Sequence, residues 1–144
     1  IKHKLVLVGQ ADKPADEHNL NKIKKLINDL GLENQVIFTG FVTNPYPWIK
    51  KAELFVLSSD LEGLPTVLVE ALILNTMVVS TNCPFGPSEI LTGKLSSFLS
   101  PIGDVEALST NIVKALNNPI EITEDLIEKF DAKTIAKQYL SLAK

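Results

Sequence analysis

Glu62, Gly63 and Glu70 lie close together in the middle of the chain, within the run from Ser58 to Leu72. Glu62 and Gly63 precede Pro65, a residue type that favours the first turn of a helix. The free backbone N–H groups and the positive dipole end of a helix start attract anions, and a glycine has no side chain to keep a phosphate away. This segment therefore predicts a phosphate-binding helix start.

Glu70 is the unusual residue of this helix, because it interrupts an otherwise apolar run and so is expected to be buried. A buried carboxylate is costly unless it is hydrogen-bonded. Thr66 lies four residues earlier, one turn away on the same helix face. A diphosphate held at Thr66 would bring a ribose near Glu70, whose two oxygens can accept from two ribose hydroxyls. The alternative is a structural acid that bonds a neighbouring helix or reaches solvent.

Glu62 lies in the loop just before the helix, where its carboxylate could reach hydroxyls of a group attached to the diphosphate. The alternative is a solvated loop acid. Asp60 and Glu62 also form an acid-x-acid pattern that could hold a divalent ion on the diphosphate. Since the helix start already supplies positive potential, we expect no metal ion and no cofactor.

The elements that must position these residues alternate between strand and helix. Leu5–Val8 is a short apolar run typical of a strand, and apolar residues at helical spacing follow from Ala15 to Leu30. Further strands are expected at 36–38, 54–57, 77–80 and 98–99, and further helices at 47–51, 65–74, after Pro87 and at 104–116. This alternation predicts an α/β fold, a parallel sheet with helices on both faces that binds ligands at the carboxyl ends of its strands.

Composition excludes several classes of protein. The 144 residues are 45% hydrophobic and 22% charged, which fits one folded domain. All basic residues are lysines, so the guanidinium groups typical of nucleic-acid readers are absent and no nucleic acid is expected as a partner. The single Cys83 cannot form an intrachain disulfide, which favours a cytoplasmic setting. No apolar run approaches the roughly 20 residues of a membrane-spanning helix.

Glu62 and Glu70, with seven residues between them, resemble the E-x7-E motif of retaining GT-B glycosyltransferases. That family includes bacterial capsule, lipopolysaccharide and exopolysaccharide transferases. The likeness extends to four further segments, which are 5–9, 36–42, 54–59 and 78–91. It implies that residues 1–144 form the Rossmann-like, nucleotide-sugar-binding C-terminal half of a GT-B fold. Residues 120–144 would be helices that cross back to a missing N-terminal acceptor domain, with an exposed apolar patch on the last helix.

The resemblance also implies roles for individual residues. Glu70 would bind the ribose of a UDP- or GDP-sugar, and Glu62 would act near the reacting carbon as the catalytic candidate. The diphosphate would be held by backbone amides, and the base would be bordered by a loop after the second strand. The residues implied in the diphosphate contact are Gly63, Leu64, Thr66 and Val67. Those implied in the base contact are Phe41 and Val42. Gly9 completes the nucleotide-sugar-binding set, although Gln10-Ala11-Asp12 follows it where the family often has another glycine.

The implied whole enzyme is a retaining hexosyltransferase that moves a sugar from a nucleotide sugar to a glycan or lipid-linked acceptor in surface polysaccharide biosynthesis. It would work in the cytoplasm or, through peripheral association, at the inner face of the membrane, and the 144-residue part alone would be inactive. A sugar-nucleotide epimerase of the same fold is one alternative, against which the E-x7-E run argues. A non-catalytic nucleotide-binding or protein-interaction module is another. A dehydrogenase is disfavoured, since no G-x-G-x-x-G follows the first strand.

Overall fold

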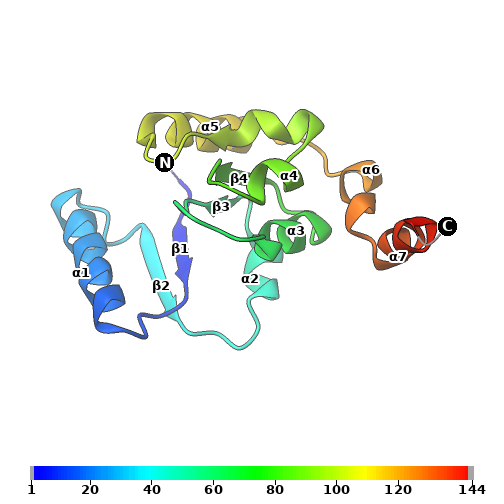
Figure 1. Cartoon of the computed structure of the whole chain (residues 1–144). Helices are drawn as coiled ribbons and strands as arrows, with labels where there is room; N and C mark the ends of the chain where they lie inside the picture. The colour runs from blue at the N-terminus through cyan, green and yellow to red at the C-terminus, as the bar shows by residue number, and fades with distance from the viewer. Residues whose placement is uncertain (1, 143–144) are drawn as a thin grey trace. The chain divides into compact units, whose positions relative to one another are not determined.

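The computed structural model describes residues 2–142, with the side chain of Ala15 excepted. The chain divides into two compact units, Ile1–Pro45 and Tyr46–Lys144. Figure 1 shows the elements of both. The first unit contains a two-stranded sheet and the second a three-stranded sheet, and all strand pairs in both sheets are parallel.

In the first unit, helix α1 (Pro14–Asp29) connects strand β1 (Leu5–Val8) to strand β2 (Val36–Gly40). The helix begins after Lys13 and ends before Gly31, whose φ of 64° is a left-handed conformation that glycine adopts without strain. The next amide, that of Leu32, donates to the carbonyl of Ile27 at 2.9 Å and closes the helix end. A glycine therefore ends this helix.

In the second unit, strands β3 (Phe55–Leu57), β4 (Val78–Thr81) and β5 (Leu99–Ser100) lie in the order β3-β4-β5. Helix α3 (Thr66–Ile73) connects β3 to β4, and helix α5 (Val105–Asn117) follows β5. Figure 1 shows α3 and α5 on opposite sides of this sheet. Helices thus cover both faces of a parallel sheet, as the sequence predicts.

Shorter helices complete the second unit. They are α2 (Tyr46–Lys51) before β3, α4 (Pro87–Ile90) and the 3-10 helix η1 (Gly93–Phe98) between β4 and β5, and α6 (Glu124–Ile127), η2 (Glu128–Phe130) and α7 (Ala132–Leu142) at the end. The one clear departure from the predicted elements is η1, which takes Phe98 out of the expected strand. A short apolar run does not distinguish a strand from a 3-10 helix, because the Phe98 side chain can be buried in either.

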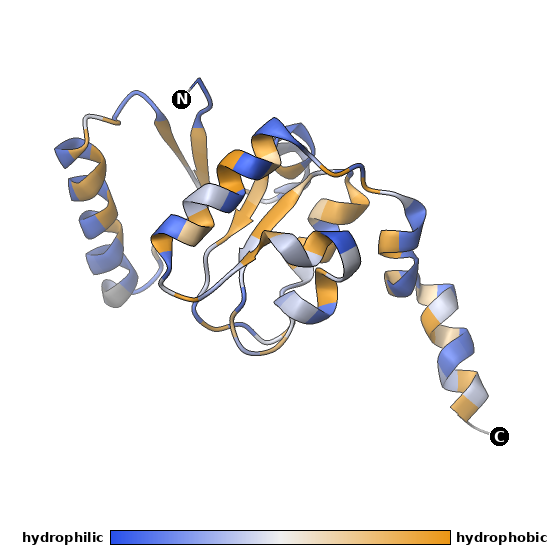
Figure 2. Cartoon of the chain, turned by 90° about the horizontal axis from the view of Figure 1, so that it is seen from above, coloured by the Kyte–Doolittle hydropathy of each residue, from blue (hydrophilic) through white to orange (hydrophobic). Residues whose placement is uncertain are grey.

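The core of the second unit is built on β4, whose four residues are all buried. Leu68 and Leu72 of α3 and Phe98 of η1 are at most 1% exposed and belong to the same cluster. Figure 2 shows the strands coloured as hydrophobic and the surface helices with mixed colours. Because β4 pairs in parallel with both β3 and β5, the carboxyl ends of all three strands lie at the same edge of the sheet.

The apolar residues after Pro119 fall into two groups. Ile122, Leu126, Ile127 and Phe130 pack against the core cluster. On α7, by contrast, Tyr139 and Leu140 are 73% and 71% exposed, and Leu142 is 81% exposed. The expected exposed apolar patch on the last helix is present. Within residues 2–142, no helix has the length and apolar character needed to cross a membrane.

Candidate functional site

The loop that joins β3 to α3 lies at the carboxyl edge of the three-stranded sheet. The strand ends at Leu57, and the helix begins at Thr66. Pro65 stands just before the first helical residue, one position earlier than the sequence predicts, and its carbonyl accepts from the amide of Leu68 at 3.0 Å. The predicted helix start is therefore found at the edge where parallel sheets bind their ligands.

The backbone amides of this helix start are mostly without partners. Among the described residues, the amides of Gly63, Leu64 and Val67 donate to no acceptor. The amide of Thr66 is different, since it donates to the carbonyl of Leu64 at 2.8 Å. Thr66 thus offers its exposed hydroxyl rather than its amide, which corrects the expected set of donors. No acidic residue lies in the first turn and no side chain caps it, so the positive end of the helix dipole is not offset there.

Gly63 leaves its side of the loop open. A Cβ atom added at this residue would meet no heavy atom within 4 Å, and its φ lies outside the left-handed region. The packing of the loop therefore does not require glycine at this position. The space that the missing side chain leaves is available to an anion that approaches the amides.

Glu62 and Glu70 are both half-buried and both lack protein partners. Among the described residues, neither carboxylate accepts a hydrogen bond or forms an ion pair. Fully buried side-chain oxygens without a partner do not occur in the described part of the chain, so both carboxylates reach the surface. An internal bond from Glu70 to a neighbouring helix, one of the two structural alternatives, is thereby excluded.

Helix α3 has two different faces, and they explain why Glu70 is not fully buried as its sequence context predicts. Leu68, Ala71 and Leu72 are at most 1% exposed and form the buried face. Thr66 and Glu70 lie one turn apart on the other side of the helix, with Ile73, which is 59% exposed, following three residues later. The hydroxyl and the carboxylate therefore share an open face that starts at the ligand-binding edge of the sheet.

The remaining predicted site residues belong to the first unit. Gly9 follows β1, and Phe41 and Val42 follow β2, so all three lie at the carboxyl edge of the two-stranded sheet. The Gly9 amide donates to the carbonyl of Gly40 at 3.0 Å, which holds the two strand ends together. Phe41 is 66% exposed and Val42 is half-buried. An exposed aromatic ring after a strand end has the shape and polarity to border a base.

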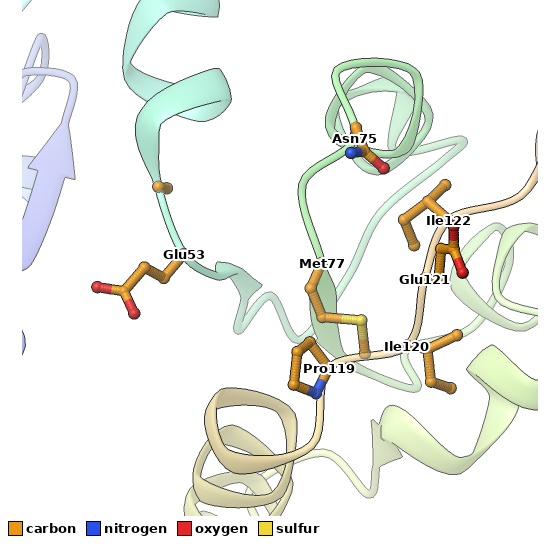
Figure 3. A pocket seen from close by; sticks show the side chains of 8 residues that line it. Glu53, Asn75, Met77, Pro119, Ile120, Glu121 and Ile122 are labelled. Carbon is orange, nitrogen blue, oxygen red and sulfur yellow. The ribbon is translucent and has the colours of Figure 1, made fainter.

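A pocket of about 320 Å³ lies at the opposite, amino edge of the three-stranded sheet. It is open, and Figure 3 shows the side chains around it, with Glu53 turned away from Met77 and Pro119. The lining is Ala52, Glu53, Asn75, Met77 and residues 119–122. No group of three or more histidine, cysteine or acidic side chains among residues 2–142 is placed to hold a metal ion. The polar groups suited to phosphate chemistry thus lie at the carboxyl edge and not in this pocket.

Comparison with known proteins decides the family. The protein family described as "Glycosyl transferases group 1" matches residues 1–133 of the chain. The chain belongs to this family. An uncharacterized glycosyltransferase of Methanocaldococcus jannaschii is 43% identical over 93 residues, which are 65% of this chain and 21% of that protein. The poly(ribitol-phosphate) alpha-N-acetylglucosaminyltransferase of Staphylococcus aureus is 27% identical over 129 residues, which are 85% of this chain and 26% of that protein.

Solved structures agree with this group 1 glycosyltransferase assignment at the level of the fold. The crystal structure of HepE from Anabaena in complex with UDP matches with a TM-score of 0.83 at 24% identity, covering 98% of this chain and 40% of that one. The predicted Rossmann-like α/β architecture of GT-B glycosyltransferases is thereby confirmed. The chain spans between 21% and 40% of the length of these three proteins.

Two further residues, both within the segment 78–91, contact the loop before α3. They are Thr81, the last residue of β4, and Gly86, which precedes α4. Thr81 donates a hydrogen bond to the carbonyl of Ser59, and Gly86 packs against residues 63–65. Only the glycine carries a sequence signal, because it stands between Phe85 and Pro87 in a run typical of a tight turn.

Proposed function

We propose that this chain is the donor-binding part of a retaining GT-B glycosyltransferase that uses a UDP- or GDP-sugar. The observation that carries the proposal is the combination, on one helix, of an uncapped start and an unpartnered carboxylate one turn further on. The amides of Gly63, Leu64 and Val67 and the hydroxyl of Thr66 would hold the diphosphate. Glu70 would accept from the ribose hydroxyls.

The remaining residues complete the proposed donor site. Glu62, half-buried and unpartnered in the described structure, would bind hydroxyls of the donor sugar near the reacting carbon. For the first unit, the family resemblance alone assigns the base contact to Phe41 and Val42 and a phosphate-side position to Gly9, and these roles stay predictions. We expect no metal ion or cofactor, because backbone amides and the helix dipole provide the positive potential that the diphosphate requires.

The proposed reaction exchanges one bond to the anomeric carbon for another on the same face of the sugar. The bond from that carbon to the diphosphate oxygen breaks, and the hydroxyl oxygen of the acceptor forms the new bond. The hydroxyl proton passes to the departing diphosphate, which keeps the bonding electrons. Catalysis would rest on positioning and on stabilising the charge that develops on the leaving group.

The acceptor and the setting belong to the same proposal. The Staphylococcus aureus relative is named for transfer to poly(ribitol-phosphate), which supports a polymeric glycan or lipid-linked acceptor. We propose that this acceptor belongs to surface polysaccharide synthesis. The acceptor would be bound by a further, N-terminal domain, toward which the helices in residues 120–144 would cross. The 144-residue chain alone is then expected to bind the donor without transferring its sugar, and the whole enzyme to act in the cytoplasm or at the inner membrane face.

Calorimetric titration of the chain with UDP, GDP and their sugars tests the proposal. We expect binding of at least one of these ligands, and a loss of at least about tenfold in affinity in Glu70→Ala, equal to roughly 1.4 kcal/mol. The matched control is Glu106→Ala, which removes an exposed acid from the first turn of α5. Equal affinity in Glu70→Ala and the parent would leave Glu70 as a solvent-facing acid and would remove the assignment.

A further inference from the structure

The connection between β4 and α4 touches the loop before α3 at two separate points. At the first point, the hydroxyl of Thr81 donates to the carbonyl of Ser59. Thr81 is 4% exposed and Ser59 is half-buried, so this part-buried bond holds the beginning of the loop to the end of β4. The loop is therefore anchored close to where it leaves β3.

At the second point, Gly86 packs its backbone directly against the end of the loop. A Cβ atom on Gly86 would lie 2.3 Å from Cδ of Pro65, 2.8 Å from the carbonyl oxygen of Gly63 and 3.3 Å from Cα of Leu64. Two of these three atoms are backbone, which cannot give way as a flexible side chain can. Gly86 also has a φ of 92°, in the region that favours glycine. Both the contact and the conformation therefore require glycine here.

Gly86 is itself held in place from the other side. Its amide donates to Oε1 of Glu89 at 3.2 Å, and its carbonyl accepts from the amides of Glu89 and Ile90 at 3.0 Å each. The far end of α4 is fixed by Lys129, whose ammonium donates to the carbonyls of Glu89 and Ile90 at 2.8 and 3.0 Å. The same ammonium donates to the hydroxyl of Thr92 at 2.9 Å. The support behind the loop thus extends to the C-terminal helices.

We propose that Gly86 is a positioning residue for the nucleotide-sugar diphosphate, an inference that rests on the function proposed above. Its close packing keeps residues 63–65 in the conformation in which the amides of Gly63 and Leu64 have no protein acceptor. A loop that is already ordered loses less conformational entropy when it binds a ligand than a mobile one does. Gly86 therefore acts through the loop, without touching the ligand, and sets the affinity for the diphosphate.

A comparison of two glycine substitutions tests this role. Gly103 also has a left-handed backbone, with φ of 73°, but a Cβ atom added there meets nothing within 4 Å. Gly86→Ala and Gly103→Ala therefore both place an alanine at a positive φ, and only the first also pushes against the loop. Calorimetry with UDP on the 144-residue chain should show affinity weakened by about tenfold or more in Gly86→Ala and by less than about twofold in Gly103→Ala.

An NMR measurement separates positioning from a general loss of stability. Without ligand, the amide signals of Gly63, Leu64 and Val67 should shift in Gly86→Ala, while those of α5 stay where they are in the parent chain. If Gly86→Ala does not fold, Thr81→Val takes its place, since it removes the other support with almost no change in shape. That variant should also bind UDP several-fold more weakly, and unchanged affinity in it would overturn the proposal.

The outcomes distinguish this inference from the function on which it rests. If the parent chain binds UDP and both alanine variants bind equally well, the positioning role is wrong and the donor site stands. If the parent chain binds neither UDP, GDP nor their sugars, the proposed function fails and the role of Gly86 fails with it. Shifted loop amides together with selective weakening in Gly86→Ala would support both.

Discussion

Helices α3 and α5 both begin at the carboxyl edge of the three-stranded sheet, but their first turns are completed differently. In α5, the side chain of Asp104 accepts from the amide of Ala107 at 2.8 Å, and Glu106 adds a second carboxylate to the first turn. In α3, Pro65 occupies the capping position, no side chain caps the helix and no acid lies in the first turn. One helix start is satisfied by its own chain, and the other is left for an external acceptor.

The two helix starts at this edge of the sheet differ in what they contribute to stability. A capped start such as that of α5 stabilises the fold by about 1 kcal/mol. Its own carboxylates offset the positive end of the helix dipole, so it attracts external anions less. The start of α3 forgoes that stabilisation. The fold compensates with the close packing of the helix itself, since Leu68, Ala71 and Leu72 are almost completely buried. Stability is thus supplied by the buried face of α3, while its first turn stays uncapped.

Thr66→Asp should remove the difference by giving α3 an acidic first turn. The carboxylate would stabilise the helix by up to about 1 kcal/mol through the dipole. It would also repel a diphosphate, and we expect UDP affinity to fall by about a hundredfold, roughly 2.7 kcal/mol. This loss is smaller than the repulsion energy of about 4 kcal/mol between two like charges 4 Å apart near a protein surface. Urea denaturation and calorimetry measure the two effects.

Thr66→Asn is the control for that substitution, because it changes the size of the side chain in the same way without adding charge. It should lose much less affinity than Thr66→Asp. A parallel loss in both variants would mean that the hydroxyl of Thr66, rather than the open positive end of the helix, determines binding. A gain in affinity for Thr66→Asp would contradict an anion site at this helix start.

The elements of this comparison could be predicted from the sequence, because each depends on local signals. A helix start is indicated by Asp104, which precedes an apolar helical pattern. A turn that leads into a helix is indicated by Gly63 and Pro65. The E-x7-E resemblance added residue roles, for which the structure provides a compatible arrangement at Glu62 and Glu70. The family and fold assignments were confirmed by comparison with known proteins, whereas the residue roles stay predictions.

The contacts that support the loop could not be predicted, because they join residues far apart in the chain. Gly86 meets Pro65 across a strand and a helix, and Lys129 reaches Ile90 over 39 residues. The burial of Glu70 was also overestimated, since an apolar run does not show which face of a helix stays open. Likewise, no sequence pattern indicated that the Thr66 amide would turn back to the carbonyl of Leu64.

Asp104→Ala tests the capped helix start, that of α5. Removing the cap of α5 leaves the amide of Ala107 without its partner and should lower the free energy of unfolding by about 1 kcal/mol. Since α5 is not proposed to touch the ligand, UDP affinity should change by less than about twofold. Thermal denaturation with and without UDP measures both quantities. An equal loss of UDP affinity in Asp104→Ala and Thr66→Asp would show that the two helix starts are not independent.

The carboxyl end of α4 provides a third and subtler case, because it is satisfied by a charged side chain. Burial lowers the pKa of Lys129 below its ordinary value of 10.5, which means that folding disfavours the charged ammonium relative to the unfolded chain. Between the lowered folded pKa and 10.5, the unfolded state binds more protons than the folded state. In this window the contribution of Lys129 to stability rises with pH.

Lys129→Met should reveal this contribution as a difference between two chains. The free energy of unfolding of the parent minus that of the variant should increase as pH rises toward 10.5, and it should be flat well below the folded pKa, where Lys129 is charged in both states. Urea denaturation at a series of alkaline pH values measures the difference and cancels the titration of other groups. We expect this change in the free energy of unfolding to be the smallest of the three effects. A difference that falls with pH would mean that hydrogen bonds to the carbonyls of Glu89 and Ile90 favour the charged form more than burial disfavours it.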